Sequence, residues 1–160
     1  RQQIQASKEY YAENNLYTAL WTMAMDNATI TNTLPEDLIK DKTEKMYENA
    51  KSYASEYGFE FEDFLTNYMG LTEEEFSKEA ETYAEVAAKE SLVLAAIAKE
   101  EGLEISKEEI DEAVAQYVSM YGYESAEDFE KENDMELFEE YILKGKVQGF
   151  LVDNAVITDK

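Results

Sequence analysis

One stretch of the sequence, Thr72 to Glu101, constrains the fold more than any other, because it marks both ends of a single long helix. Thr72 with Glu75 three residues later is a capping box, and Gly102 suits the left-handed position that closes a helix. At 1.5 Å per residue this helix would span roughly 45 Å, well beyond the mean helix of about 11 to 12 residues. A compact domain could not cover such a helix along its whole length.

The two halves of this helix differ in their apolar surface. The first half carries one apolar stripe, made of Phe76, Ala80, Tyr83 and Ala87. The second half, SLVLAAIA, is apolar on nearly every side. The pattern predicts a C-terminal half buried in the body of the molecule and an N-terminal half that projects from it.

Proline, glycine and capping residues divide the rest of the chain into further helices. Pro35, the only proline, suits the first position of a helix that ends at Gly58. A second capping box, Ser106 with Glu109, begins a helix that ends at Gly122. The sequence predicts an all-α chain with an extended connector at 26–33 and helices at about 1–26, 35–57, 59–70, 72–101, 106–121, 125–133 and 134–155.

Two glycines, Gly145 and Gly149, lie inside the last predicted helix. Each interior glycine costs about 1 kcal/mol relative to alanine. Two explanations are open: the glycines lie on a partly exposed face without a packing role, or they allow one close helix crossing.

An internal repeat organises the chain. Three segments of one copy recur in the same order in the other: 34–39 with 105–110, 53–59 with 117–123, and 62–64 with 127–129. The repeat predicts a leading helix and connector at 1–33, a longer helical hairpin at 34–102 and a shorter one at 103–160. We expect an elongated molecule with two hairpin arms on a shared body and a groove between the arms.

The chain is strongly acidic. Its 160 residues include 14 Lys and Arg against 37 Asp and Glu, a net charge of −23. This charge repels phosphate backbones and anionic lipids, so we expect no nucleic-acid partner and no membrane partner. Basic polypeptides are the partners that it would attract.

The residues that most enzymes depend on are missing. The chain has neither His nor Cys, so Ser/His and Cys/His nucleophilic arrangements cannot be built. No EF-hand loop and no Glu-x-x-His motif is present, and the six glycines are scattered rather than clustered in a phosphate loop. We therefore expect no enzyme activity, no cofactor and no metal, and an acid-residue hydrolase or metal protein is the least favoured class.

Aromatic and methionine residues gather at the predicted hairpin turns. The candidate client-binding residues are Phe59, Phe61, Phe64, Leu65, Tyr68 and Met69 in the first copy and Met120, Tyr121 and Tyr123 in the second. Met and Tyr suit adaptable apolar contact with many partners. The alternative is that these side chains pack the short helix against its own hairpin.

The ordered segments LPEDLI, YASEYGFEFEDFL, GLTEEEF, AAIAKEEGLEISKEEIDEAV, YGYESAEDFEKEN and FLVDNAVI resemble the C-terminal domain of bacterial trigger factor. The similarity covers nearly the whole chain. It implies an all-helical fold shared with SurA-type chaperones, in which two arms and a body form a cradle that holds unfolded or nascent polypeptide without ATP. The family's ribosome-docking domain and its prolyl isomerase domain are not in these residues, so a ribosome would be reached only through a domain outside this chain.

The resulting hypothesis is an ATP-independent chaperone module of the cytoplasm that binds unfolded or nascent polypeptides, with a preference for basic ones. The alternative is a non-catalytic helical interaction module of a larger prolyl isomerase or cell-surface protein that recognises one folded partner. A lipoprotein signal upstream of Arg1 would favour the cell surface. Homodimer formation is left open.

Overall fold

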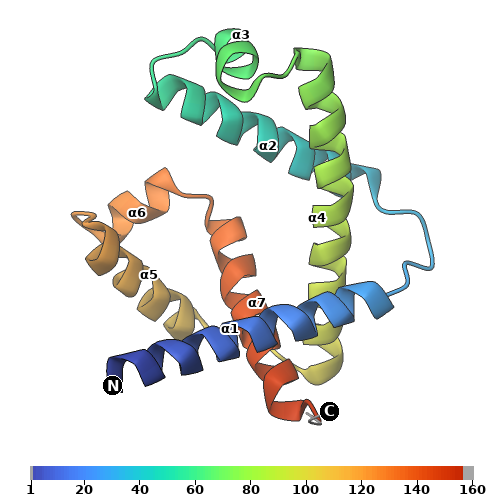
Figure 1. Cartoon of the computed structure of the whole chain (residues 1–160), viewed down its shortest axis with the longest axis vertical. Coiled ribbons are helices and arrows are strands. Elements are labelled where there is room, and N and C mark those ends of the chain that lie inside the picture. Colours follow the sequence, from blue (N-terminus) through green and yellow to red (C-terminus); the bar gives the residue numbers. More distant parts are fainter. Residues whose placement is uncertain (1, 157–160) are drawn as a thin grey trace. The chain divides into compact units, whose positions relative to one another are not determined.

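The computed structural model describes residues 2–156, with side chains from residue 14 onward, and every regular element in this part is helical. The elements are α1 (Gln2–Asn27), α2 (Glu36–Glu56), α3 (Phe61–Asp63), the π-helix η1 (Phe64–Met69), α4 (Glu73–Glu101), α5 (Lys107–Tyr121), α6 (Ala126–Glu132) and α7 (Met135–Asn154) (Figure 1). The predicted all-α class is confirmed.

The helix ends follow the capping chemistry of the sequence. At the start of α4 the Glu75 carboxylate accepts the Thr72 N–H at 2.8 Å, and the Thr72 hydroxyl accepts the Glu75 N–H at 3.2 Å. Gly102 has a φ of 64°, and the next N–H, of Leu103, reaches back to the Ala98 carbonyl at 2.8 Å, which satisfies one of the last carbonyls of α4. Ser106 and Glu109 form the predicted capping box of α5.

Pro35 lies one position earlier than predicted. Its ψ of 125° is extended, so Pro35 is the N-cap residue and Glu36 is the first helical residue of α2. The cause is local, because the Pro35 carbonyl already accepts the N–H groups of Leu38 and Ile39 while its own backbone stays outside the helix.

The chain divides into two compact units. Thr29–Leu92 forms one, here called the inserted unit, and the segments on either side of it form the other, here called the terminal unit. The long helix α4 begins in the first and ends in the second. The C-terminal part of α4 therefore packs with α1 and α7 rather than with the hairpin that it closes in the sequence.

The inserted unit is built around one core from α2, η1 and α4. Its buried residues are Ala50, Ala54, Phe64, Leu65, Phe76 and Ala80. Phe76 is 1% exposed and meets the edge of the Tyr47 ring at a centroid distance of 4.9 Å. Burial of a side chain of this size contributes about 1.5–3 kcal/mol, so Phe76 is a main anchor of α2 against α4.

The predicted apolar stripe of α4 is wrong in its second half. The buried row runs in steps of four, through Phe76, Ala80, Ala84 and Ala88, whereas Tyr83 is 59% exposed and Ala87 is half-buried. Small alanines at this spacing form the buried face of the helix, and the larger tyrosine lies outside it. The N-terminal half of α4 is thus buried along one face.

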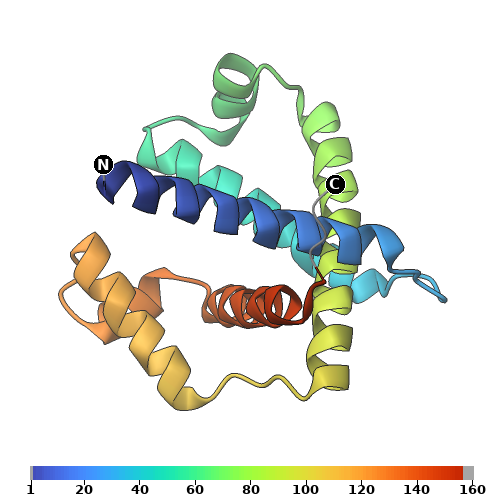
Figure 2. The same cartoon turned by 60° about the horizontal axis from the view of Figure 1, so that its bottom comes forward.

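The terminal unit contains two separate cores, both reached by α7. Trp21 of α1, Val93, Leu94 and Ala98 of α4 and Val147 of α7 form the first. Val114 of α5, Phe129 of α6 and Phe138 of α7 form the second. Figure 1 shows α1 crossing α7, and Figures 1 and 2 show α6 joining α5 to the start of α7.

The two repeat copies fold alike, each as a long helix, a short helical segment and a second long helix. The equivalent phenylalanines Phe64 and Phe129 are both buried. Phe76 and Phe138, each four residues beyond an N-cap, both meet a tyrosine edge-on, at 4.9 Å and 5.0 Å. The burial of these phenylalanines therefore recurs in both copies. The tyrosines that they meet do not occupy equivalent positions, because Tyr117 aligns with Tyr53, which is 57% exposed, and not with Tyr47.

Candidate functional site

The turn of the first hairpin carries a stack of aromatic rings that runs from the core to the surface. Phe64 is buried, and the Tyr68 ring stacks on it at 5.1 Å with an interplanar angle of 15°. The Tyr57 ring stacks on Tyr68 in turn, at 6.2 Å and 19°. Tyr57 and Tyr68 are 61% and 66% exposed. Stacking on a core residue holds these rings at the surface, so they present a rigid apolar area to solvent.

The structure separates the predicted client-binding residues of the first hairpin into two groups. Phe59, Tyr68 and Met69 are exposed and Phe61 is half-buried. Phe64 and Leu65, in contrast, are 5% and 1% exposed, because they fill the core between α2 and α4. A client cannot reach these two side chains in this structure, so they belong to the hairpin's own packing.

The backbone of this segment is a π-helix, where the sequence indicated only a short helix. Gly70 closes it with a φ of 72°, and the Leu65 carbonyl accepts N–H groups from both Gly70 and Leu71. Single π-helical turns are rare and occur frequently at functional sites. Here the π-helical turn carries the buried pair Phe64 and Leu65 together with the exposed pair Tyr68 and Met69.

The turn of the second hairpin is also partly apolar at its surface. Met120 and Tyr121 are 71% and 65% exposed. Tyr123 is half-buried, since its ring meets Phe129 edge-on at 5.2 Å and its hydroxyl accepts a hydrogen bond from the Asn133 side chain at 3.3 Å. Met120 and Tyr121 are therefore the accessible members of the predicted set in this hairpin.

Sequence reasoning missed several exposed residues beside the predicted ones. Tyr53 and Tyr57 on α2 are more than half exposed, as is Tyr141 on α7. A signal for the first two was present, because Tyr53 and Tyr57 belong to the repeated Tyr-x-x-x-Tyr-Gly motif whose second tyrosine is exposed in both copies.

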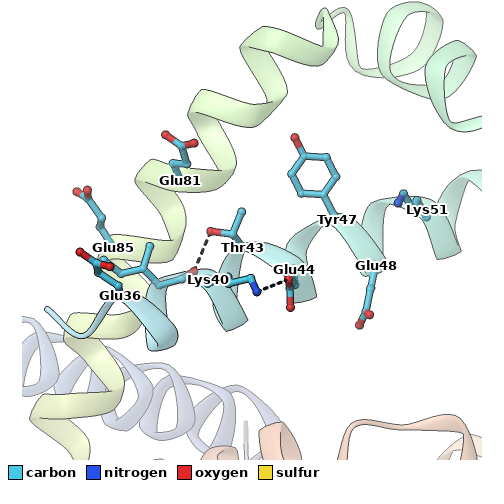
Figure 3. Close-up of a pocket in the computed structure, with 10 residues that line it drawn as sticks. Glu36, Lys40, Thr43, Glu44, Tyr47, Glu48, Lys51, Glu81 and Glu85 are labelled. Atoms are coloured by element: carbon cyan, nitrogen blue, oxygen red, sulfur yellow. Dashed lines mark hydrogen bonds and ion pairs between the residues drawn. The ribbon is translucent and has the colours of Figure 1, made fainter.

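A groove of about 690 Å³ lies within the inserted unit, along one face of α2 (Figure 3). Its lining comes from α2 (Glu36, Ile39, Lys40, Thr43, Glu44, Tyr47, Glu48 and Lys51) and from α4 (Glu81 and Glu85). Ile39 and Tyr47 give it apolar surface. The Thr43 hydroxyl donates to the Ile39 carbonyl at 2.8 Å, which satisfies its polar atom and leaves its methyl group to extend that surface.

Charges of both signs border this groove, with acid in excess. Five glutamates and two lysines line it. Lys40 lies 3.6 Å from Glu44, an exposed pair one helical turn apart. The Lys51 ammonium lies over two rings, 5.6 Å from the centroid of Phe61 and 6.0 Å from that of Tyr47. A groove with these walls suits an amphipathic, positively charged occupant.

The carboxylates with perturbed pKa values belong to helix caps. A hydrogen bond from Lys146 at 2.6 Å, followed by the bonds from Ser106, lowers the pKa of Glu109 to about 2. Bonds from Thr72 likewise lower the pKa of Glu75. Lys146 also donates to the Glu104 carbonyl at 2.7 Å, so this lysine ties α7 to the loop before α5. These groups serve the fold rather than a reaction.

Two further findings concern the described residues. They contain no group of three or more acidic side chains arranged to hold a metal ion. None of their helices combines the length and the hydrophobicity needed to cross a bilayer.

Comparison with protein families identifies the family to which the chain belongs. The family described as bacterial trigger factor protein (TF) C-terminus matches residues 1–153. The chain belongs to this family. Family membership supports a chaperone-related function, because this domain is the chaperone part of trigger factor.

Curated trigger factors extend the match to individual proteins. The trigger factor of Halothermothrix orenii is 32% identical over 158 residues, which cover 96% of this chain and 36% of that protein. That of Pelotomaculum thermopropionicum is 31% identical over 159 residues, covering 98% of the chain and 36% of the protein. That of Macrococcus caseolyticus is 30% identical over 122 residues, covering 76% of the chain and 28% of the protein. The chain thus spans about a third of the length of these relatives at most. No solved structure matches it.

Proposed function

We propose that this trigger factor C-terminal domain is an ATP-independent chaperone module that holds unfolded or nascent polypeptide on apolar surfaces of its helical hairpins. The observation that carries the proposal is the aromatic stack at the first hairpin turn, where Tyr57 and Tyr68 are exposed although their rings are aligned on buried Phe64. Contacts of this kind are individually weak and tolerate many sequences, which suits a holder of unrelated clients.

The strong acidity of the chain supports two further parts of the proposal. A net charge of −23 keeps a protein with exposed aromatic side chains soluble and draws positively charged clients toward it. Basic unfolded segments are thus the preferred clients. A cytoplasmic location, an isomerase domain elsewhere in the parent protein and ribosome contact through another domain are proposed by analogy with the family, and the cradle between two arms stays a prediction.

The test replaces the exposed members of the first turn, Tyr57, Phe59, Tyr68 and Met69, together by serine. We expect weaker suppression of aggregation for several unrelated denatured proteins. The loss of thermal stability should be limited to the surface ring contacts, because all four side chains are at least 41% exposed and the core residues Phe64 and Leu65 are kept. Glu56→Ser with Asn67→Ser, on exposed polar residues of the same turn, is the matched control.

Two outcomes would count against the chaperone assignment. Unchanged suppression by the fourfold variant would show that the aromatic turn does not hold clients. Saturable binding to a single folded protein, with no protection of unrelated clients by the wild-type chain, would favour the alternative of a specific interaction module. Phe64 is left out of the test because its loss would open the core of the hairpin.

A further inference from the structure

The groove along α2 has the length of a short extended peptide. Its lining residues on α2 run from Glu36 to Lys51, about four helical turns or roughly 22 Å. At about 3.3 Å per residue, an extended chain of about seven residues spans that distance. Successive side chains of such a chain point to opposite sides, so alternate residues would face the apolar floor and the others would face the glutamates at the border.

The charges that line the groove favour a positively charged occupant. Glu36, Glu44 and Glu48 border it from α2, and Glu81 and Glu85 border it from α4. Against these five carboxylates stand only Lys40 and Lys51 among the lining residues. Lys40 is already paired with Glu44. An occupant that brings Lys or Arg between the two helices would meet carboxylates on both sides.

The position of the Lys51 ammonium indicates where a Lys or Arg side chain of the occupant would bind. Its ammonium lies 5.6 Å from the Phe61 centroid and 6.0 Å from the Tyr47 centroid, a distance at which a cation is attracted to an aromatic face. Lys51 comes from α2 itself and its side chain is exposed, so it can swing out into solvent. The groove thus contains an internal cation at the end nearest the hairpin turn.

We propose that the groove between α2 and α4 of the inserted unit binds an extended client segment in which Lys or Arg alternates with apolar residues, and that Lys51 occupies the aromatic end of the groove until a client cation displaces it. The proposal rests on the proposed function only in assigning the segment to an unfolded client. In this proposal Glu81 and Glu85 favour positively charged client segments, and the Lys51 side chain competes with a client cation for the aromatic end of the groove. The apolar turn around Tyr57 and Tyr68 has no part in this selection by the groove.

The probe is a fluorescein-labelled peptide of about eight residues that alternates Val and Lys, with a Val/Gln peptide as its neutral counterpart. Binding is measured by fluorescence anisotropy at low ionic strength. Glu81→Gln with Glu85→Gln should weaken binding of the Val/Lys peptide by about two- to thirty-fold, the range that two exposed ion pairs supply. Lys51→Met should tighten it by about two- to five-fold, the worth of an exposed cation–π contact.

Matched variants distinguish the effect of the groove charges on peptide affinity from the effect of the net charge of the chain. Glu112→Gln with Glu130→Gln removes the same two charges from exposed positions of the second hairpin, and Lys78→Met removes one lysine from the inserted unit outside the groove. These controls should change the affinity by much less than their groove counterparts. Equal effects of groove and control variants would overturn the proposal, because attraction would then come from the net charge alone. Far-UV circular dichroism verifies that each variant keeps its helix content.

The outcomes for the groove and for the chaperone function are distinguishable. Loss of Val/Lys peptide binding in the Glu81/Glu85 variant, with aggregation suppression of a client poor in Lys and Arg retained, supports the groove. A wild-type chain that binds the peptide but protects no client would refute the chaperone function and leave the groove standing. Failure of the Val/Lys peptide to bind better than the Val/Gln peptide would refute the groove, whatever the aggregation assay shows.

Discussion

The two interior glycines of α7 offer a quantitative test of the fold, because alanine at Gly145 and Gly149 should stabilise the terminal unit. A Cβ atom built at either position meets no heavy atom within 4 Å, and neither residue is among the glycines with positive φ. Alanine therefore fits the native backbone without strain. It also reduces the conformational freedom of the unfolded chain, which is the main source of the gain.

The expected size follows from helix propensity. Each glycine in a helix interior costs about 1 kcal/mol relative to alanine, so the double variant should gain about 2 kcal/mol. For a chain of this length that corresponds to a rise of about 4–8 °C in its melting temperature. The space around both positions also rules out the close helix crossing considered from the sequence, since a crossing that requires glycine would place atoms where the Cβ would be.

The assay is urea unfolding followed by tryptophan fluorescence. Trp21 is the only tryptophan, is 7% exposed, and packs in the same cluster as Val147 of α7. Its emission therefore reports the unit that contains both glycines. With a slope of about 1–3 kcal/mol per molar urea, a gain of about 2 kcal/mol raises the midpoint by roughly 0.7–2 M.

Gly102, which lies at the end of α4 in the same unit, provides the control for the double α7 variant. Gly102→Ala should lower the midpoint, because Gly102 has a φ of 64°, where a residue with a Cβ loses about 1 kcal/mol or more. If the double α7 variant unfolds at the same urea concentration as the wild type, or at a lower one, the two glycines have a backbone role that the open space around them does not reveal.

Three further predictions concern single positions of the terminal unit. Phe129→Ala, at a side chain that is 2% exposed, should cost about 3–5 kcal/mol in urea unfolding followed by circular dichroism. Ser106→Ala should cost about 1 kcal/mol in the same assay, since it removes the N-cap of α5. Because the pKa of Glu109 falls from 4.5 to about 2 on folding, its stabilising contribution is complete above pH 4.5 and is lost as the pH falls from 4.5 toward 2. Lys146→Met should therefore reduce the loss of stability between pH 7 and pH 3, measured from urea midpoints, whereas Lys131→Met, which affects an ion pair within α6, should not.

Much of the secondary structure could be predicted because helix ends depend on neighbouring residues. Thr72 with Glu75 and Ser106 with Glu109 make their capping bonds within four residues of chain. Gly122 needs only its own positive φ to end a helix. Interactions between residues this close in the chain can be predicted from a single sequence.

Features that depend on distant residues could not be predicted in the same way. The spacing within α4 does not decide whether Tyr83 or Ala84 is buried, because burial depends on the surfaces that pack against the helix, and the structure buries Ala84. The groove is lined by residues 36–51 and by Glu81 and Glu85, which are separated by 30 residues or more. The π-helical hydrogen bonds of η1 leave no recognised pattern in the sequence.

The repeat nevertheless contains information on which aromatics are accessible. In both copies the phenylalanine of the Glu-Asp-Phe segment is buried, as Phe64 and Phe129, and the tyrosine before the glycine is exposed, as Tyr57 and Tyr121. A tyrosine hydroxyl must find a hydrogen-bond partner when it is buried, whereas at the surface it bonds to water and the ring stays available for contact. Tyrosine rather than phenylalanine at the turn is thus consistent with exposure, and Tyr57 and Tyr121 are equivalent positions of the repeat whose rings are accessible to a client in both copies.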